Sequence, residues 1–229
     1  DKVYRNVGRL DGYGEDAALG GDDPYSASKA MADILTQCWV TSFPDAPTAI
    51  ARAGNVIGGG DVSKDRLLVD LIAGFAADAP VRIRYPDAVR PWQHVLDCLA
   101  GYLALAGALL RGEQAGAWSF GPDPGGFQTV RETADVSAAS WGAGARWIDD
   151  SAAMHPHEAP LLTLDPGKAQ RALGWRNILP FPASVDWTID WYKSVAEGRD
   201  AREVAAEQLD RYLALDPDAP WITALEDQR

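Results

Sequence analysis

Cysteine and histidine are scarce in this sequence, and that scarcity limits the kinds of site it can hold. Among 229 residues there are two cysteines, Cys38 and Cys98, and three histidines. Two isolated cysteines do not form a disulfide framework and lack zinc-site spacing. His155 and His157 have only Glu158 as an acidic neighbour, so we predict no metal site. We expect both cysteines to be small buried apolar residues, in a protein of the reducing cytoplasm.

Positive charge and long apolar runs are also limited. The chain has 21 Lys and Arg against 33 Asp and Glu, a formal net charge of -12. It lacks a Lys- and Arg-rich stripe, so we expect no nucleic-acid partner, and an anionic substrate would need a local basic cluster. The longest apolar stretch, Leu99 to Leu110, is too short for a membrane span and is interrupted by glycines. We expect no signal peptide and no membrane partner.

Helix and strand patterns alternate in the first part of the chain, which predicts an α/β fold with a parallel sheet. The later part is richer in helix, as expected of a lobe on that sheet. The expected helices are residues 25–41, 65–77, 96–111, 130–141, a short one after Pro166, 180–197 and 201–213. The expected strands are residues 48–53, 81–84, 93–95, 117–120 and 146–148, with residues 54–61 forming a glycine-rich loop.

Tyr25 and Lys29 form a Tyr-x-x-x-Lys pattern at the start of the first predicted helix. Residues four apart lie on one helix face, so the lysine ammonium can stabilise the phenolate of the tyrosine. Such a tyrosine can accept a proton from a substrate hydroxyl near neutral pH, as hydride abstraction from an alcohol requires. Because the bare pattern is common, two unrelated surface side chains are the alternative interpretation.

The surroundings of this pair carry a family resemblance. The helix is entered through Asp23-Pro24-Tyr25, and the next strand ends in Arg52-Ala53-Gly54-Asn55. Both features resemble the extended short-chain dehydrogenase/reductases. Further stretches are similar to the CDP-glucose 4,6-dehydratase branch of that family, over about residues 1–195. They are Arg52 to Asp61, Asp65 to Leu67, Arg90 to Val95, Phe120 to Pro122 and His155 to Ala159.

The resemblance implies an architecture and a cofactor. It implies the C-terminal part of a Rossmann-like parallel sheet plus a smaller, mostly helical substrate-binding lobe. Residues 1–62 would be a partial dinucleotide-binding domain with the active-site helix. Residues 63–229 would mainly form the sugar-nucleotide-binding lobe, interleaved with remaining Rossmann elements. NAD would be the cofactor, with Tyr25 and Lys29 contacting it, and relatives pair through this helix, so a homodimer is possible.

The same resemblance assigns a role to Asp1 and Lys2. Sugar-nucleotide 4,6-dehydratases carry an acid/base pair there, and the Asp-Lys form is typical of the CDP-glucose branch. Asp1 would protonate the departing C6 hydroxyl, and Lys2 would remove the C5 proton. Asp1 must then stay protonated and Lys2 neutral. Without the resemblance, a disordered terminal pair would be the simpler interpretation.

The substrate side rests on the resemblance as well. It places Asn55, Arg66 and Arg90 near the diphosphate of a sugar nucleotide, which arginine can bind through paired hydrogen bonds. His157 and Glu158 match a segment near the nucleotide. For each arginine a surface salt bridge is the alternative, and we interpret His94 as a satisfied core histidine. Two residues, Ser119 and Pro160, stand where the CDP-glucose branch usually has other residues. Both could alter contacts with the nucleotide base or the sugar.

Two expected features are not found in the 229 residues. A Thr or Ser should precede Asp1, and a Gly-x-x-Gly-x-x-Gly loop should follow an early strand. We therefore expect an N-terminally truncated enzyme that is inactive alone, because hydride transfer needs a bound cofactor. The predicted activity of the longer protein is NAD-dependent dehydration of CDP-glucose. A different nucleotide specificity, a 4-epimerase and a non-catalytic sugar-nucleotide-binding fragment remain alternatives.

Overall fold

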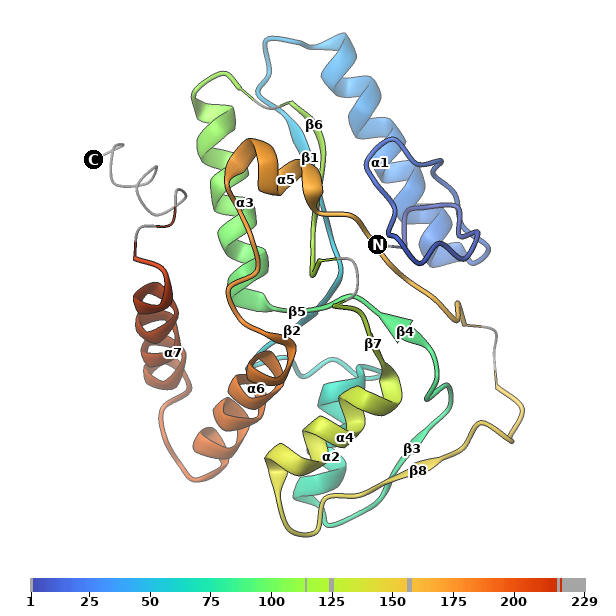
Figure 1. Cartoon of the computed structure of the whole chain (residues 1–229), viewed down its shortest axis with the longest axis vertical. Coiled ribbons are helices and arrows are strands. Elements are labelled where there is room, and N and C mark those ends of the chain that lie inside the picture. The colour runs from blue at the N-terminus through green and yellow to red at the C-terminus, as the bar shows by residue number, and fades with distance from the viewer. Residues whose placement is uncertain (1, 114, 124–125, 156–157, 218, 220–229) are drawn as a thin grey trace.

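Helices and short strands alternate along the chain, as the α/β prediction requires (Figure 1). The computed structural model describes residues 2–113, 115–123, 126–155, 158–217 and 219. The helices there are α1 (Pro24–Ser42), α2 (Leu67–Ala76), α3 (Val95–Leu110), α4 (Val130–Trp141), α5 (Gly167–Leu173), α6 (Phe181–Ala196) and α7 (Ala201–Leu215). The strands are β1 (Ala49–Ala53), β2 (Asn55–Ile57), β3 (Val81–Ile83), β4 (Val89–Arg90), β5 (Trp92–His94), β6 (Gly116–Phe120), β7 (Gln128–Thr129) and β8 (Trp147–Asp149).

The described strands join in pairs, and most of the pairing is parallel. β1 lies parallel to β6, β2 to β5 and β3 to β8, whereas β4 and β7 are antiparallel. Parallel neighbours need a long crossover connection, and α3 forms the last part of the one between β1 and β6. The predicted α/β class with parallel strands is therefore confirmed, while the antiparallel pair was not foreseen.

The glycine-rich segment after β1 differs from its prediction as a loop. Asn55–Ile57 form β2, which pairs with β5, so only the second half of the segment is a loop. Gly54 permits this pairing, because a Cβ there would lie 2.3 Å from the carbonyl oxygen of Pro91. A Cβ on Gly59 would lie 2.1 Å from Cγ of Trp191 in α6. These glycines therefore serve close packing of the chain against itself.

Helices cover the strands in two groups (Figure 1). α1 and α3 lie on either side of β1 and β6, while α2, α4 and α6 pack together beside β2 and β3. The largest core cluster lies between α3, β6, α5 and α7, where Trp118, Phe120 and Trp175 are at most 1% exposed. The C-terminal part is mainly helical, as predicted, and α7 packs on α6.

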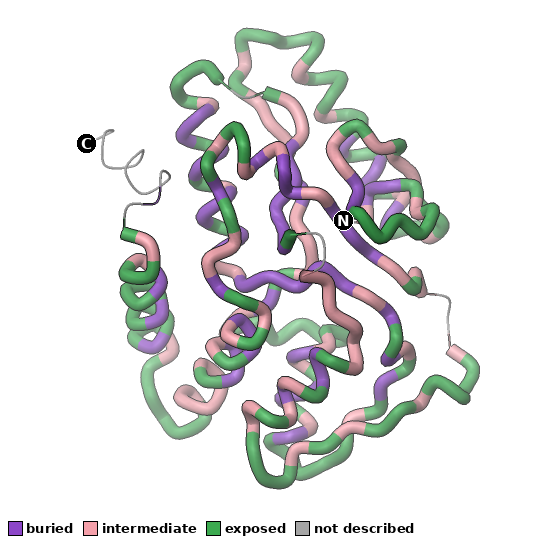
Figure 2. Tube along the Cα trace, in the orientation of Figure 1, coloured by how far each residue is buried: buried purple, intermediate pink, exposed green. Residues whose placement is uncertain are grey.

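Helix α1 is largely exposed, although apolar residues on it suggested a buried face (Figure 2). Leu35 and Trp39 are 70% and 50% exposed, and only the other face contacts β1 and β6. Cys38 is exposed on this helix, so the prediction that both cysteines are buried is wrong for Cys38 and right for Cys98. Among the described helices, none has the length and apolar character needed to cross a bilayer.

Candidate functional site

Most of the predicted site residues line one cleft of about 1190 Å³. They come from the start of the chain, from α1, from the β1–β2 junction and from the segments around α2 and β4, so the fold assembles them from distant parts of the sequence. Asp1 and His157 lie outside the described residues. The predicted residues that line the cleft are Lys2, Tyr25, Lys29, Asn55, Arg66, Arg90 and Glu158.

Tyr25 and Lys29 occupy the first turns of α1. Asp23 caps this helix, its carboxylate accepting hydrogen bonds from the backbone N–H groups of Tyr25 (2.9 Å) and Ser26 (3.0 Å). The cap fixes where the helix begins, and Pro24 favours the first turn. The Tyr25 side chain is 57% exposed, and within the described residues no hydrogen bond reaches its phenol or the Lys29 ammonium. Both groups are thus accessible to a ligand in the cleft.

Lys2 lies at the start of a folded segment that returns to the beginning of α1. The backbone N–H of Gly20 donates to the carbonyl of Val3 at 2.9 Å, and Tyr4 pairs with Leu19 in an antiparallel bridge. Hydrogen bonds from Ser26, and also the positive charge of Lys2, hold the pKa of Asp23 below its ordinary value. Lys2 is therefore close to the helix that carries Tyr25 and Lys29.

Asn55 and Arg66 line the same cleft. Asn55 is half-buried at the start of β2, where its backbone N–H donates to the carbonyl of Pro91 at 2.9 Å. Arg66 is exposed and directly precedes α2. No ion pair joins the Arg66 side chain to any residue that the structure describes, so the salt bridge considered for it is not observed there.

Arg90 is buried, although it does form a salt bridge. Its side chain is 4% exposed and donates from Nη2 to Oε1 of Glu158 at 2.7 Å. Backbone hydrogen bonds from Val89 to the carbonyl of Pro160 and from Leu162 to the carbonyl of Val89 hold the Glu158 segment beside β4. The salt bridge considered as the alternative for Arg90 is therefore present, and it is half-buried in the cleft wall, with Arg90 enclosed and the Glu158 side chain 35% exposed.

Basic side chains outnumber acidic ones in the cleft lining, although the chain as a whole has a net charge of -12. A local excess of positive charge is the condition that an anionic ligand imposes on an acidic protein. The charged lining residues are Lys2, Lys29, Arg52, Lys64, Arg66, Arg82, Arg84 and Arg90 against Asp33, Asp61, Asp65, Asp70 and Glu158.

The sequence interpretation missed a buried polar cluster in the wall of this cleft. Arg52 donates two hydrogen bonds to the carboxylate of Asp33, at 2.7 and 2.8 Å, and one to the hydroxyl of Tyr4 at 3.2 Å. Ser119 is fully buried, its side chain bonded to the Tyr4 hydroxyl at 3.0 Å and its N–H to Glu15. The polar groups of Ser119 therefore contact protein, and Ser119 is not among the residues that line the cleft, so its effect on base or sugar contacts stays a prediction.

His94 is only partly satisfied, in contrast to its prediction as a satisfied core histidine. Its Nδ1 accepts a hydrogen bond from the backbone N–H of Leu96 at 3.3 Å and so caps α3. Its Nε2 is buried and has no partner among the described residues. Burial lowers the pKa of His94 to about 4, so the ring is neutral at neutral pH.

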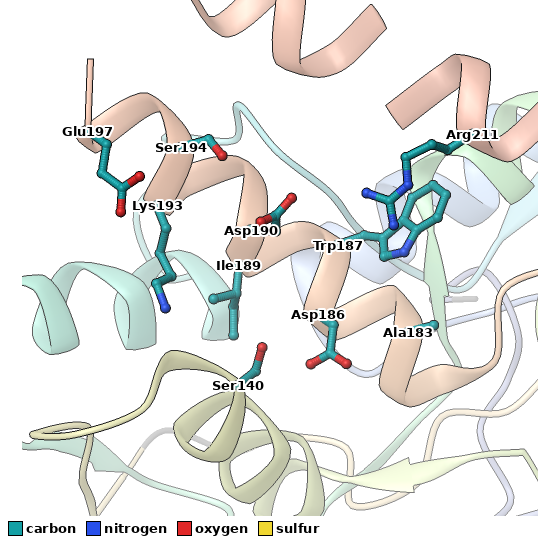
Figure 3. A pocket seen from close by; sticks show the side chains of 10 residues that line it. All are labelled: Ser140, Ala183, Asp186, Trp187, Ile189, Asp190, Lys193, Ser194, Glu197 and Arg211. Atoms are coloured by element: carbon teal, nitrogen blue, oxygen red, sulfur yellow. The ribbon is translucent and has the colours of Figure 1, made fainter. Parts of the chain in front are cut away.

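A second cleft of about 490 Å³ lies between α4, α6 and α7 (Figure 3). Its lining carries charges of both signs, including Asp186, Asp190 and Lys193, and it contains none of the predicted site residues. The guanidinium of Arg211 lies over the ring of Trp187 at 4.4 Å and partly fills this space. Within the residues described, no cluster of His, Cys, Asp and Glu has the composition to bind a metal ion.

Comparisons with known proteins show the family to which the chain belongs. Residues 2–121 match the family described as the NAD dependent epimerase/dehydratase family. The chain is 36% identical over 224 residues to CDP-glucose 4,6-dehydratase of Salmonella typhimurium (strain LT2), an alignment covering 93% of this chain and 62% of that enzyme.

Two solved structures share the fold. The dTDP-glucose 4,6-dehydratase from Bacillus anthracis str. Ames, in complex with NAD, matches with a TM-score of 0.70 and 20% identity, over 86% of this chain and 60% of that one. A UDP-glucuronic acid 4-epimerase from Bacillus cereus, in complex with UDP-glucuronic acid and NAD, gives 0.72 and 18%, over 85% and 60%. The chain spans about three fifths of the length of these proteins.

Proposed function

Because this chain belongs to the NAD dependent epimerase/dehydratase family, we propose that it forms the catalytic and substrate-binding part of a sugar-nucleotide 4,6-dehydratase. The observation that carries the proposal is the single cleft lined by Lys2, Tyr25 and Lys29 together with Arg66 and Arg90. The proposed substrate is CDP-glucose, supported by the 36% identity to a CDP-glucose 4,6-dehydratase.

The cleft residues fit one end of NAD. The free phenol of Tyr25 and the ammonium of Lys29 can hydrogen-bond a nicotinamide ribose, and NAD would supply the hydride acceptor at C4 and the hydride donor at C6. The Gly58 to Gly60 loop does not fit a diphosphate cradle, because the space beside Gly59 is filled by Trp191. We propose that Tyr25 and Lys29 hold the nicotinamide end, and that the 229 residues alone bind sugar nucleotide without turning it over.

Each catalytic residue has one proton to move. Tyr25 accepts the proton of the C4 hydroxyl as that carbon is oxidised, and the resulting C4 ketone acidifies the C5 proton. Lys2, as the neutral amine, takes the C5 proton, and Asp1 supplies the proton with which the C6 hydroxyl leaves as water. A 4-epimerase has no need of the C5 base or the C6 acid, so Lys2 favours the dehydratase.

The remaining site residues would bind the diphosphate and nucleotide. Arg66 has a free guanidinium at the cleft, and Arg90 has a rigid position in the cleft wall. Arg66 can donate paired hydrogen bonds to phosphate oxygens, and Arg90, whose terminal nitrogens already contact Val89 and Glu158, would contribute its positive charge. Asn55, His157 and Glu158 complete the proposed binding set, with Glu158 placed by its ion pair to Arg90.

Calorimetric titration with CDP-glucose, CDP and UDP-galactose tests the substrate proposal. We expect CDP-glucose and CDP to bind and Arg66→Met to weaken both about tenfold or more, since one charge-assisted contact contributes about 1.5–3 kcal/mol. Adding NAD and following the loss of one water by mass spectrometry tests turnover. Preferential binding of UDP-galactose would contradict the dehydratase proposal, and product from the 229 residues would contradict the proposal that they are inactive alone.

We also propose that the exposed apolar face of α1 pairs with a second copy of the chain. The support is the resemblance to relatives that pair through this helix, together with the exposed side chains of Leu35 and Trp39. Size-exclusion chromatography with light scattering measures the mass directly. A monomer that is unchanged by Leu35→Lys would contradict this proposal.

A further inference from the structure

Arg52 forms a buried, bidentate ion pair with Asp33. Its Nε and Nη2 atoms donate to the two carboxylate oxygens of Asp33 in α1, at 2.7 and 2.8 Å. The two side chains are 1% and 3% exposed. A planar guanidinium is suited to this geometry because both parallel hydrogen bonds form at once, which fixes angle as well as distance.

The remaining nitrogen of Arg52 contacts residues 2–20, the segment that begins with Lys2 and is called the Lys2 segment below. Nη1 donates to the hydroxyl of Tyr4 at 3.2 Å and to the carbonyl of Glu15 at 3.0 Å. The guanidinium also lies over the Tyr4 ring, 5.1 Å from its centroid. One side chain on β1 therefore contacts both the Lys2 segment and the helix with Tyr25 and Lys29.

No other side chain in the described part of the chain makes this double connection. The bond from Arg52 is the one side-chain hydrogen bond there that joins α1 to a distant segment. The other described polar contacts of the Lys2 segment lead elsewhere, for example from Asn6 to the carbonyl of Leu161. Backbone hydrogen bonds from Gly20 to Val3 and from Arg5 to Ala18 also hold the Lys2 segment near the start of α1, and Arg52 adds the side-chain link between that segment and Asp33, farther along the helix.

We infer that Arg52 is a positioning residue, which sets the geometry of Lys2 relative to Tyr25 and Lys29. The inference rests on the proposed function, in which both groups act on neighbouring carbons of one sugar ring. Tyr25 must reach the oxygen on C4 while Lys2 reaches the proton on C5. A misplacement of about 1 Å is enough to cost about 100-fold in rate.

Deuterium exchange at C5 tests whether Tyr25 and Lys2 reach neighbouring carbons of one sugar ring at the same time. The exchange is redox-neutral and requires no hydride transfer. With the 4-keto product, CDP-4-dehydro-6-deoxyglucose, in D₂O, neutral Lys2 takes the C5 proton and the electron pair moves onto the C4 oxygen, where Tyr25 donates a hydrogen bond. Lys2 exchanges its proton with solvent and returns deuterium to C5. The measured quantity is the rate of deuterium incorporation by mass spectrometry, with Lys2→Met as the blank.

Arg52→Lys is the test variant. Lysine keeps the positive charge but cannot form the bidentate hydrogen bonds of the guanidinium to Asp33. We expect the exchange rate of the folded protein to fall about 100-fold while the Kd for CDP-glucose changes less than threefold, since Arg66 and Arg90 are untouched. Arg146→Lys, in an exposed ion pair with Asp78, is the matched control and should leave the rate unchanged. A rate that falls only with the folded fraction would overturn the inference.

A distance measurement tests the geometry separately from any chemistry. Cys38 on α1 is exposed and Cys98 is buried, so an Asp16→Cys variant offers two sites for spin labels, one on each segment. We expect a narrow distribution of label distances that broadens in Arg52→Lys and not in Arg146→Lys. An unchanged distribution would overturn the inference.

The two measurements separate failure of the inference from failure of the proposed function. If the wild-type chain shows no exchange above the Lys2→Met blank, the proposed role of Lys2 fails, and the label distances alone decide whether Arg52 positions the segments. If exchange occurs and Arg52→Lys changes neither the exchange rate nor the label distances, the proposed role of Lys2 is retained and the inference about Arg52 fails.

Discussion

Two buried aspartates, Asp33 in the cleft wall and Asp97 in the helical part, have opposite pKa shifts. Burial raises the pKa of Asp33, but hydrogen bonds from Arg52 and Gln37 outweigh it and bring the pKa below its ordinary value. For Asp97 burial dominates over hydrogen bonds from neutral donors, and its pKa is raised to about 6. The comparison indicates that a cationic partner can lower the pKa of a buried carboxyl group where neutral donors do not offset its burial.

The two regions use their aspartates for different connections. Asp97, near the start of α3, accepts from the backbone of Ile178 at 2.8 Å and from the Tyr212 hydroxyl of α7 at 2.8 Å. It therefore joins α3 and α7 to the segment that precedes α6, through neutral groups. Asp33 joins α1 to the strand and to the Lys2 segment through a charged group. Removing a partner should therefore have different consequences in the two regions.

Arg52→Met should have the largest effect on stability. It leaves the Asp33 carboxylate buried without a cationic partner, which costs about 3–5 kcal/mol in free energy of unfolding. Urea denaturation followed by circular dichroism measures the change. Arg146→Met removes an exposed ion pair and should cost less than about 1 kcal/mol. Equal losses in the two variants would contradict the distinction between the buried and exposed pairs.

Asp97→Asn should change how stability depends on pH. The pKa of Asp97 rises on folding from 3.8 to about 6, so the native protein binds the proton more tightly. Its contribution to stability is complete below about pH 4 and is lost as the pH rises through 6.

Relative to Asp97→Asn, the wild-type protein should therefore lose about 3 kcal/mol in free energy of unfolding between pH 3 and pH 7, at about 1.4 kcal/mol per pKa unit. His94, whose pKa is lowered to about 4, has the opposite dependence, and it cancels because both proteins contain it. Denaturant titrations at several pH values provide the difference. A difference that is constant with pH would contradict the raised pKa of Asp97.

Gly59→Ala tests the place where the cleft meets the helical part. The added Cβ would lie 2.1 Å from Cγ of Trp191, so the loop or α6 must shift, at a cost of about 1–3 kcal/mol. Gly14→Ala is the control, since a Cβ at that position has no neighbour within 4 Å. Thermal unfolding of both variants is the measurement. Equal melting temperatures would contradict the expected cost, because the loop would then accommodate the added methyl group without loss of stability.

The smallest expected effect concerns the aspartate that caps one helix in each region. Asp23 caps α1 and Asp200 caps α7, each accepting two backbone N–H bonds. Substitution of either by alanine should cost about 1 kcal/mol. A much larger loss for Asp23→Ala would show that the cleft side depends more on its helix start, and urea denaturation of the pair decides this.

Local signals were sufficient for most helices because their start residues and apolar periods lie within one segment. Asp23 and Pro24 predict the start of α1, and the observed helix begins at Pro24. The strand β2 was missed because its short, glycine-flanked segment is stabilised by pairing with β5, a contact between distant residues. The exposure of Cys38 was missed because periodicity does not specify which neighbour covers a helix face.

The site could be predicted only in the residues that belong to local motifs. Tyr25 and Lys29 are four residues apart, and the cleft indeed contains both. Arg52 and Asp33 are separated by 19 residues, and neither neighbourhood signals an ion pair. Their partnership follows from how α1 packs on β1, which depends on the whole fold. The catalytic and binding roles remain predictions.

The packing of Gly59 against Trp191 also has an evolutionary consequence. The loop residue and the helix residue occupy the same space, so neither position can grow unless the other shrinks. Among proteins that share this fold, a side chain at position 59 should therefore occur with a smaller residue at position 191. The two positions, 132 residues apart in the chain, are expected to vary as a pair.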